Sequence, residues 1–242
     1  MARTRADLLL VARGMAASRS QARAAIEAGG VAANGVPIRK PSELVDESAV
    51  LDFAPAHPWA SRAGLKLAHA LDAFLIDPAG RVCLDIGAST GGFTDVLLAR
   101  GAERVIAIDV GVGQMQPRLA AHPRVHMRER TDARSLTREN LPEAPTLVVC
   151  DASFISAAKV LAAPLSLAAP SADLVVLVKP QFEAGPGRVK SGVLEERTAR
   201  RVAREAMAAL NGLEGFRFVA AAESPILGGD GNLEVLAHYR RG

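Results

Sequence analysis

The stretch Leu84-Asp85-Ile86-Gly87-Ala88-Ser89-Thr90-Gly91-Gly92-Phe93 decides the fold of most of this chain. It joins an apolar run, Val82 to Ile86, to a helical pattern from Phe93 to Ala99. Glycines at such a junction allow a tight turn and let the backbone pass close to a bound nucleotide or nucleoside, because they carry no side chain. The stretch therefore predicts a buried strand, a turn suited to a ligand, and a helix.

Strand-like runs and helical patterns alternate around this stretch. A helix is expected from Ala63 to Leu75, and strand-like runs lie at Val105 to Ile108, Thr146 to Cys150 and Leu174 to Val178. Short β-branched runs that alternate with helical patterns are typical of right-handed βαβ units and of a parallel sheet with helices on both faces. We therefore expect an α/β fold for this part of the chain.

The same turn indicates which ligand it suits. The dinucleotide fingerprint needs a glycine where Ser89 stands, and the carboxylate of Asp85 would repel a pyrophosphate. Asp85 can instead accept a hydrogen bond from an amino acid's ammonium group, and Asp109, at the end of the next strand, can bind both hydroxyls of a ribose. An amino acid joined to a ribose is S-adenosylmethionine. The alternative is that the glycines only form a tight turn, and Asp109 argues against it.

Four ionisable residues stand where a buried sheet would carry apolar ones. Asp151 and Lys179 each follow an apolar run, and in an open parallel sheet both would lie at the carboxyl edge, beside the ligand crevice. Glu234 lies in a later strand-like run, and Lys66 stands at the entry to the large domain. Taken alone, each residue is more simply a solvated charge at a strand end.

The first 40 residues are strongly basic. They hold seven Lys or Arg and two Asp or Glu, whereas the whole chain has a net charge of +3. We expect two short helices, the second capped by Ser18 and ended by Gly29, and then a hairpin about Asn34-Gly35. Arg19 and Arg23 are one helical turn apart, so their side chains either meet a phosphate backbone or form a solvated face.

A proline-containing segment separates the two parts. Residues 54–62 include Pro55 and Pro58 and show no periodicity, which is typical of a connector. We therefore expect a small α+β domain over residues 1–53, a linker over residues 54–62 and an α/β domain over residues 63–242.

Composition limits the class of protein. With 49% hydrophobic and 23% charged residues, a chain of 242 residues can bury a core, which excludes a disordered protein. The two cysteines lie in apolar runs and the N-terminus lacks the apolar segment of a signal peptide, so we expect a cytoplasmic protein. Pro164, Pro170 and Asp173 interrupt the longest apolar stretch, so we expect no membrane span, and we expect no metal site.

The N-terminal part resembles a known RNA-binding domain. The residues follow the order found in the small domain named after ribosomal small-subunit protein four, in the segments Arg5–Gly14, Ser18–Arg23, Ala28–Val31 and Ala33–Gly35. In that family the arginine-bearing helix docks on structured RNA. The resemblance implies that Arg5, Arg19 and Arg23 contact RNA.

The large domain resembles the S-adenosylmethionine-dependent methyltransferases. Its D-x-G-x-x-x-G-G pattern is similar to their motif I, and Asp109 matches their ribose-binding acid. The resemblance also implies that the loop of residues 129–133 holds the adenine. The cofactor-binding residues that it implies are Asp85, Gly87, Ser89, Gly91, Gly92, Phe93, Asp109, Thr131 and Asp132.

Three motifs carry a closer resemblance, SRAGLKL (61–67), VVCDASFIS (148–156) and LVKPQFE (177–183). Their charged residues and one later glutamate match, in order, the Lys-Asp-Lys-Glu tetrad of the FtsJ-like ribose 2′-O-methyltransferases: Lys66, Asp151, Lys179 and Glu234. The whole chain resembles the TlyA family of ribosomal RNA 2′-O-methyltransferases. It departs from that family at Ala63, where a glycine is expected, which concerns only the local backbone.

This resemblance implies both a fold and an activity. The fold is a Rossmann-like class I methyltransferase domain with a central seven-stranded, mostly parallel sheet, preceded by the small α+β RNA-binding domain. The activity is transfer of a methyl group from S-adenosylmethionine to a ribose 2′-hydroxyl, of a cytidine, in the ribosomal RNA of ribosomal subunits. The enzyme is expected to be a monomer that uses the tetrad for catalysis.

Our mechanistic hypothesis is that Lys179 removes the hydroxyl proton, so that the ribose oxygen can attack the sulfonium methyl in line. Lys179 must then be neutral. Burial and the charge of Lys66 favour the neutral amine, whereas the carboxylates of Asp151 and Glu234 oppose it.

Two basic segments lie near the proposed site. The loop of residues 180–192 is either a lid that grips the substrate through Arg188 and Lys190 or a merely mobile loop. The helix that follows is either a second phosphate-binding face or a solvated face laced by glutamates, and its basic residues are Arg197, Arg200, Arg201 and Arg204.

Two other classes of protein are alternatives for this sequence. Relatives in the family have been labelled hemolysins, but the sequence has no strong basic amphipathic helix that would support a membrane-active protein. A catalytically silent RNA-binding factor would keep the cofactor fold only as a scaffold. Asp85, Asp109 and the complete tetrad argue against that alternative.

Overall fold

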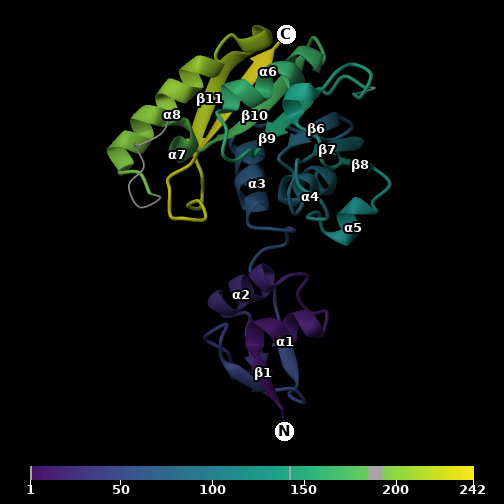
Figure 1. Ribbon diagram of the computed structural model, residues 1–242, viewed down its shortest axis with the longest axis vertical. Helices are drawn as coiled ribbons and strands as arrows, with labels where there is room; N and C mark the ends of the chain where they lie inside the picture. Colours follow the sequence, from purple (N-terminus) through teal and green to yellow (C-terminus); the bar gives the residue numbers. More distant parts are fainter. Residues whose placement is uncertain (1, 142, 185–192) are drawn as a thin grey trace. The chain divides into compact units, whose positions relative to one another are not determined.

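The computed structural model describes residues 2–141, 143–184 and 193–242, and the chain forms two compact units, Met1–Ser61 and Arg62–Gly242 (Figure 1). The boundary falls inside the segment expected to be a linker. The Ala54 amide donates a hydrogen bond of 2.7 Å to the Gly30 carbonyl, so the segment begins within the first unit. The three-part division at residues 53 and 62 stays a prediction.

The first unit combines short helices with short strands. Helix α2 begins after Ser18, whose Oγ accepts a hydrogen bond of 3.2 Å from the Gln21 amide, as predicted. Asn34 and Gly35 have φ angles of 49° and 76°, which confirms the predicted hairpin. The helices are α1 (Ala6–Ala12) and α2 (Arg19–Glu27), and the strands are β1 (Arg3–Arg5), β2 (Val31–Ala33), β3 (Val36–Pro37), β4 (Leu44–Asp46) and β5 (Leu51–Phe53).

A seven-stranded sheet forms the centre of the second unit, in the order β11-β12-β10-β9-β6-β7-β8. Its strands are β6 (Val82–Ile86), β7 (Arg104–Ile108), β8 (Val125–Arg128), β9 (Leu147–Cys150), β10 (Ala172–Val178), β11 (Arg217–Glu223) and β12 (Val235–Arg241). Strands β6 to β10 pair in parallel, and β12 runs antiparallel to both of its neighbours. The predicted α/β class and mostly parallel seven-stranded sheet are confirmed.

Helices cover both faces of this sheet (Figure 1). Helices α3 and α4 pack together on one face, whereas α6 and α8 share the large apolar core of the other face. The helical segments are α3 (Ala63–Ala73), α4 (Gly92–Ala99), α5 (Pro117–Ala120), α6 (Ala157–Leu167), α7 (Pro180–Glu183) and α8 (Glu196–Leu210), with 3-10 turns η1 (Ala133–Ser135) and η2 (Leu213–Gly215). Among the described residues, no helix is long and apolar enough to cross a bilayer.

The order of the strands determines where a ligand can bind. From β6 the chain builds outward to β7 and β8, and it then returns to β9 and β10 on the other side of β6. Ligands of open α/β sheets bind at such a switch point, outside the carboxyl ends of the strands. Lys179 follows β10 at this edge. Glu234 was expected inside a strand, but it immediately precedes β12, and the register that pairs Val178 with Val235 places it opposite Lys179.

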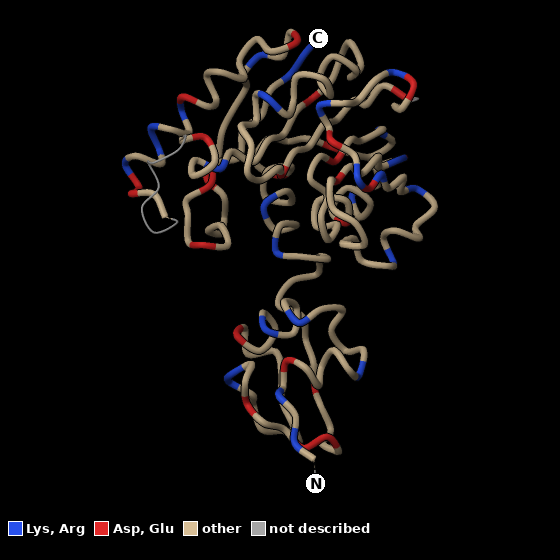
Figure 2. Tube along the Cα trace, in the orientation of Figure 1, with Lys and Arg blue, Asp and Glu red and all other residues tan. Residues whose placement is uncertain are grey.

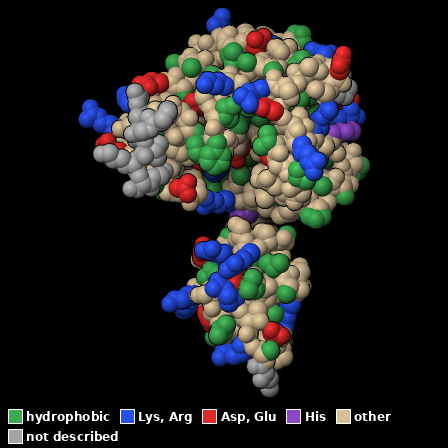
Figure 3. Space-filling model, viewed as in Figure 1, with side chains coloured by type: hydrophobic (Ala, Val, Ile, Leu, Met, Phe, Trp, Pro, Cys, Tyr) green, Lys and Arg blue, Asp and Glu red, His purple; other side chains and the backbone are tan. Residues whose placement is uncertain are grey.

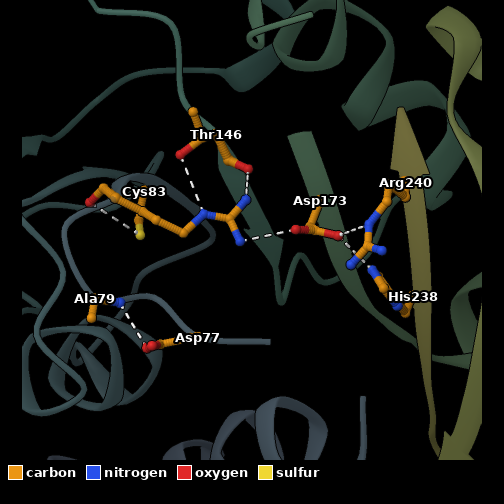
Figure 4. A network of polar contacts seen from close by, with 8 residues as sticks. Asp77, Ala79, Cys83, Thr146, Asp173, His238 and Arg240 are labelled. Atoms are coloured by element: carbon orange, nitrogen blue, oxygen red, sulfur yellow. Dashed lines mark hydrogen bonds and ion pairs between the residues drawn. The ribbon is translucent and has the colours of Figure 1, made fainter. Parts of the chain in front are cut away.

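A buried carboxylate fixes the opposite end of the same strands (Figure 4). Asp173, in β10, accepts hydrogen bonds of 2.8 Å from His238 Nε2 and Arg240 Nε, both in β12. It also accepts a 2.9 Å bond from Arg81, which itself bonds to Thr146 beside the start of β9. Although burial opposes the change, these three donors lower the pKa of Asp173.

We expect Asp173→Asn to lower the free energy of unfolding by about 3 kcal/mol, since it leaves two arginines and a histidine without their shared anion. Urea unfolding checks this value. Asp72→Asn is the matched control, because its pair with Arg100 is largely solvent-exposed and should contribute less than about 1 kcal/mol. Equal effects of the two substitutions would contradict the role assigned to Asp173.

The same network makes stability depend on pH. Since the folded-state pKa of Asp173 lies below its ordinary value of 3.8, its contribution is complete well above that pH and is lost as the pH falls below it. Acid titration of the wild type and the Asp173→Asn variant should therefore show the difference in stability shrinking in acid.

Candidate active site

A cavity of about 400 Å³ opens at the carboxyl ends of β6, β7 and β9. It occupies the crevice beside the switch point of the sheet. Apolar side chains such as Ile108 and Val160 form part of its wall, next to backbone and carboxylate groups. The predicted site residues that line it are Gly87, Ser89, Asp109, Thr131, Asp132 and Asp151.

Two residues in the turn after β6 that line the cavity have positive φ, Gly87 at 80° and Ser89 at 45°. Ser89 therefore adopts a backbone conformation that glycine more often supplies. Its amide donates a hydrogen bond of 2.8 Å to Asp109 Oδ2, and the Gly111 amide donates one of 2.7 Å to Oδ1. These bonds hold the carboxylate in the cavity wall, and each oxygen keeps a lone pair for a hydroxyl donor.

Asp85 lies outside the cavity wall, under the turn. Its side chain is fully buried, with Oδ2 accepting a 2.6 Å hydrogen bond from Thr94 Oγ1 and Oδ1 lacking a hydrogen-bond partner among the described residues. Burial raises the pKa of Asp85 to about 7, against the opposing effect of the Thr94 bond. Asp85 thus fastens the turn to helix α4, while Asp109 faces the ligand space.

Gly91, Gly92 and Phe93 also lie outside the cavity wall. A Cβ atom on Gly91 would come within 2.4 Å of Leu119 Cδ1, so Gly91 permits α5 to pack on the turn. Phe93 is buried in the core. These three residues build the start of helix α4, and their direct contact with a cofactor stays a prediction.

The loop after β8 supplies another part of the wall. The Thr131 amide donates a 3.0 Å hydrogen bond to the Asp109 carbonyl, which joins this loop to the end of β7. Asp132 caps η1 by accepting a 2.9 Å bond from the Arg134 amide, and its carboxylate lies 2.6 Å from Arg134 Nη2. The hydrogen bonds from Arg134 lower the pKa of Asp132, so its carboxylate is an ionised acceptor at neutral pH.

Lys179 forms an ion pair with Asp151, and the distance from Nζ to Oδ1 is 2.6 Å. The amine also donates to Ser153 Oγ at 2.8 Å and to the Asp151 carbonyl oxygen at 3.3 Å. The side chains of Lys179 and Asp151 are only 11% and 16% exposed. Because Asp151 and Ser153 line the cavity, the amine stands at its border.

Lys66, on α3, forms a second and deeper ion pair with Glu234. Their side chains are 7% and 3% exposed. Since the β10–β12 register sets Glu234 opposite Lys179, the structure brings the four predicted catalytic residues to one edge of the sheet as two ion pairs.

Two contacts that the sequence analysis missed join the VVCDASFIS and LVKPQFE segments. The rings of Phe154 and Phe182 lie 4.8 Å apart between centroids. Glu183 Oε1 accepts a 2.8 Å hydrogen bond from the Ala157 amide and so caps α6, where the side chain of Ser156 makes no capping bond. The acidic last residue of α7 was the only sequence signal for this cap.

Phe154 is itself a residue that the sequence analysis missed. Its φ is 65°, and its side chain is 88% exposed where it lines the cavity. The left-handed conformation costs about 1–2 kcal/mol for a residue that carries a Cβ. Strained backbone of this kind clusters at ligand-binding sites, because the surrounding structure must hold it in place. Phe154 is therefore a candidate contact for substrate.

Two of the predicted RNA-binding arginines share a buried partner. Arg5 Nε lies 3.0 Å from Asp7 Oδ1 and Arg19 Nε lies 2.8 Å from Asp7 Oδ2. The hydrogen bonds from Arg5 hold the pKa of Asp7 well below its ordinary value, against burial and with help from Arg19. Arg23 is exposed, and the described residues give it no ion-pair partner. Arg5 and Arg19 thus have a structural contact that Arg23 lacks.

Other basic residues fall into two groups. Figure 2 shows both basic and acidic residues along α8, and Figure 3 shows Lys and Arg side chains on the first unit. On α8, Arg200 pairs with Glu196 and Glu223, and Arg201 pairs with Glu205, which favours a solvated helix face. The proposed lid residues Arg188 and Lys190 lie outside the described residues.

The described part of the chain shows neither a cluster of metal ligands nor an exposed thiol. It contains no group of three or more His, Cys, Asp and Glu side chains placed to hold a metal ion. Cys83 and Cys150 are free and buried, and burial raises the pKa of both thiols to about 12.

The chain matches two protein families. Residues 59–241 match the FtsJ-like methyltransferase family and residues 4–51 match the S4 domain family. The chain is 47% identical to the 16S/23S rRNA (cytidine-2′-O)-methyltransferase TlyA of Mycobacterium tuberculosis, over 98% of this chain and 90% of the relative. It belongs to the TlyA family of FtsJ-like methyltransferases. The predicted family is thereby confirmed.

Other TlyA-family relatives carry a different kind of name. Hemolysin A of Brachyspira hyodysenteriae is 37% identical over 97% of this chain and 99% of the relative. The solved structure of a candidate hemolysin from Streptococcus thermophilus has a TM-score of 0.78 at 36% identity, covering 100% of this chain and 89% of that chain. Relatives named as rRNA methyltransferases and relatives named as hemolysins therefore both match this chain over nearly its whole length.

We expect Gly87→Ala to destabilise the second unit by about 3 kcal/mol, because strain from positive φ adds to steric overlap. A Cβ atom at Gly87 would lie 3.0 Å from the Asp151 carbonyl oxygen and 3.1 Å from the Ala152 nitrogen. Gly80→Ala is the control, since Gly80 also has positive φ but open space around it. Thermal unfolding of both variants checks the difference, and equal losses would contradict the close approach.

Proposed function

We propose that this chain transfers a methyl group from S-adenosylmethionine to the 2′-hydroxyl of a cytidine in ribosomal RNA. The observation that carries the proposal is the Lys179–Asp151 ion pair at the border of the cavity. The activity printed for the Mycobacterium tuberculosis relative supports the choice of ribosomal RNA and of cytidine.

The cavity fits the proposed cofactor. The Asp109 carboxylate is held in the wall with lone pairs for two ribose hydroxyls, and Gly87, in the same wall, lets the turn pass close to the backbone of Asp151. The apolar part of the wall suits an adenine ring, and Thr131 and Asp132 are the polar groups beside it. S-adenosylmethionine supplies an electrophilic methyl group on its sulfonium. The Asp85 side chain lies under the turn, and its contact with the amino group of the cofactor stays a prediction.

The side chains at the border of the cavity perform the proton chemistry. The neutral amine of Lys179 accepts the proton of the ribose hydroxyl, and Asp151 fixes the position of Nζ. The Lys66–Glu234 pair is internally neutralised and buried, so it keeps the neighbouring end of the sheet rigid without adding net charge. The tetrad thus divides into a reactive pair and a supporting pair.

The first unit is proposed to dock on ribosomal RNA. Its S4-domain match and the exposed guanidinium groups of Arg5, Arg19 and Arg23 support this role. Ribose chemistry ignores base identity, so the docking position selects the nucleotide. The partner would be ribosomal RNA within ribosomal subunits, and the enzyme would act as a cytoplasmic monomer.

The two alternatives have separate tests. A membrane-active protein would release dye from liposomes, and a silent RNA-binding factor would bind ribosomal subunits without transferring methyl groups. The hemolysin names of relatives favour testing the first alternative. The Lys179–Asp151 ion pair at the border of the cavity favours an enzyme over both alternatives.

Lys179→Ala should lower kcat for methyl transfer by about a thousandfold or more, because the proton acceptor is lost. The assay follows labelled methyl groups from S-adenosylmethionine into subunits from cells that lack this protein, and alkali resistance then locates the modified ribose. Cofactor binding should be unchanged. Lys159→Ala, an exposed lysine on α6, is the control. Full turnover by the Lys179→Ala variant would refute the assignment.

Phe154→Ala should weaken binding of the RNA substrate by about 1–3 kcal/mol, the contribution of one base stacked on an aromatic ring. Phe154→Tyr keeps the ring and should keep the affinity. Leu75→Ala is the matched control, since Leu75 is 90% exposed and also has positive φ, at 54°, but does not line the cavity. An unchanged dissociation constant for Phe154→Ala would argue against stacking.

A further inference from the structure

Gln114 is a polar residue of the cavity wall that the sequence analysis missed. Its Oε1 accepts a hydrogen bond of 3.0 Å from Ser89 Oγ, and both residues line the cavity together with Asp109. The bond joins the turn after β6 to the loop after β7. These are the two segments whose backbone amides, at Ser89 and Gly111, hold the Asp109 carboxylate.

Gly111 leaves room for the carboxamide of Gln114. The backbone of Gly111 does not have positive φ, so its conformation is open to residues that carry a side chain. A Cβ atom on Gly111 would nevertheless overlap Gln114 Nε2, and it would lie 2.8 Å from Gln114 Cδ and 3.1 Å from Asp109 Oδ1. The nitrogen end of the carboxamide and the carboxylate therefore border the same small space above Gly111.

The charge of Asp109 decides which end of the carboxamide faces it. With Oε1 bonded to Ser89, the N–H groups lie on the side of the carboxylate, whereas the opposite orientation would turn the amide oxygen toward an anion. Gln114 Nε2 carries two N–H donors, and the described residues give it no acceptor. The cavity wall thus presents free N–H donors next to a carboxylate that keeps lone pairs.

We infer that Gln114 is a cofactor-binding residue, whose Nε2 donates a hydrogen bond to a ribose hydroxyl oxygen of S-adenosylmethionine. This inference rests on the cofactor of the proposed function. A hydroxyl group both donates and accepts hydrogen bonds, whereas the ionised carboxylate of Asp109 can only accept them. Gln114 supplies the donor that Asp109 lacks, and Ser89 fixes the direction of its carboxamide.

Calorimetric titration of the full chain with S-adenosylhomocysteine, which carries the same ribose, tests this inference without RNA. Gln114→Ala should raise the Kd about 3- to 10-fold, because one neutral hydrogen bond is lost. Gln114→Glu keeps an acceptor for Ser89 but replaces the N–H donor by a carboxylate oxygen, so it should raise the Kd at least as much. Val112→Ala is the matched control, since Val112 is 52% exposed in the same loop and does not line the cavity.

A change in the ligand distinguishes a direct contact from a structural role. The second titration uses the analogue of S-adenosylhomocysteine that lacks both ribose hydroxyls. The ratio of the Kd of Gln114→Ala to that of the wild type should fall to about 1 for this analogue, because the acceptor of the proposed bond is absent. If Gln114 only braced the two loops, the substitution would weaken the binding of both ligands by the same factor.

The outcomes separate the inference from the proposed function. A wild type that does not bind S-adenosylhomocysteine overturns the proposed cofactor and the role of Gln114 together. A wild type that binds it with the same Kd as Gln114→Ala overturns the inference alone, and so does an equal loss of affinity for the analogue without ribose hydroxyls. A wild type that shows the expected Kd ratios but methylates no ribosomal RNA overturns the proposed substrate and leaves the inference standing.

Discussion

The antiparallel register between β10 and β12 is the constraint on which the site depends. At one end, the buried carboxylate of Asp173 binds His238 and Arg240 and so fixes which residues of the two strands face each other. At the other end, the same register sets Glu234 opposite Lys179. In a sheet whose other central strands are parallel, only a strand of reversed direction can begin at the carboxyl edge and deliver the residue before it to the crevice. A slip of one residue would turn every side chain of β12 to the wrong face.

Local patterns were sufficient to predict strands β6, β7, β9 and β10, the turn after β6 and the edge of the sheet where charges gather. The run from Leu84 to Phe93 carries its own turn chemistry, and the apolar runs before Asp151 and Lys179 indicate strands by composition alone. Pairing within the tetrad was not predictable in this way. That Lys66 binds Glu234, while Lys179 binds Asp151, depends on how strands distant in sequence are ordered in the sheet. The cap from Glu183 to α6 has the same long-range origin.

The spacing of the sequence motifs also did not predict which carboxylates support the structure and which line the cavity. Asp85 and Asp109 were both expected to face the cofactor, yet Asp85 is buried against Thr94 and only Asp109 lines the cavity. In the first unit, a pattern of arginines one helical turn apart gave no sign that Asp7 would hold Arg5 and Arg19. In both cases a buried carboxylate lies beneath the groups that are expected to face a ligand. Burial decides whether a carboxylate orders the structure or faces a ligand, and a short sequence motif gives little information about burial.

With the proposed role of Phe154 in binding RNA, its left-handed backbone sets stability against substrate binding. Glycine or asparagine adopts such a conformation at little cost, and an exposed ring contributes no core packing in return for the strain. Glycine or asparagine in place of Phe154 would therefore make the protein more stable. The same substitution would remove the proposed contact with the substrate. The chain accepts this loss of stability at Phe154, and the proposed contact with the RNA substrate is the function that we assign to the exposed ring.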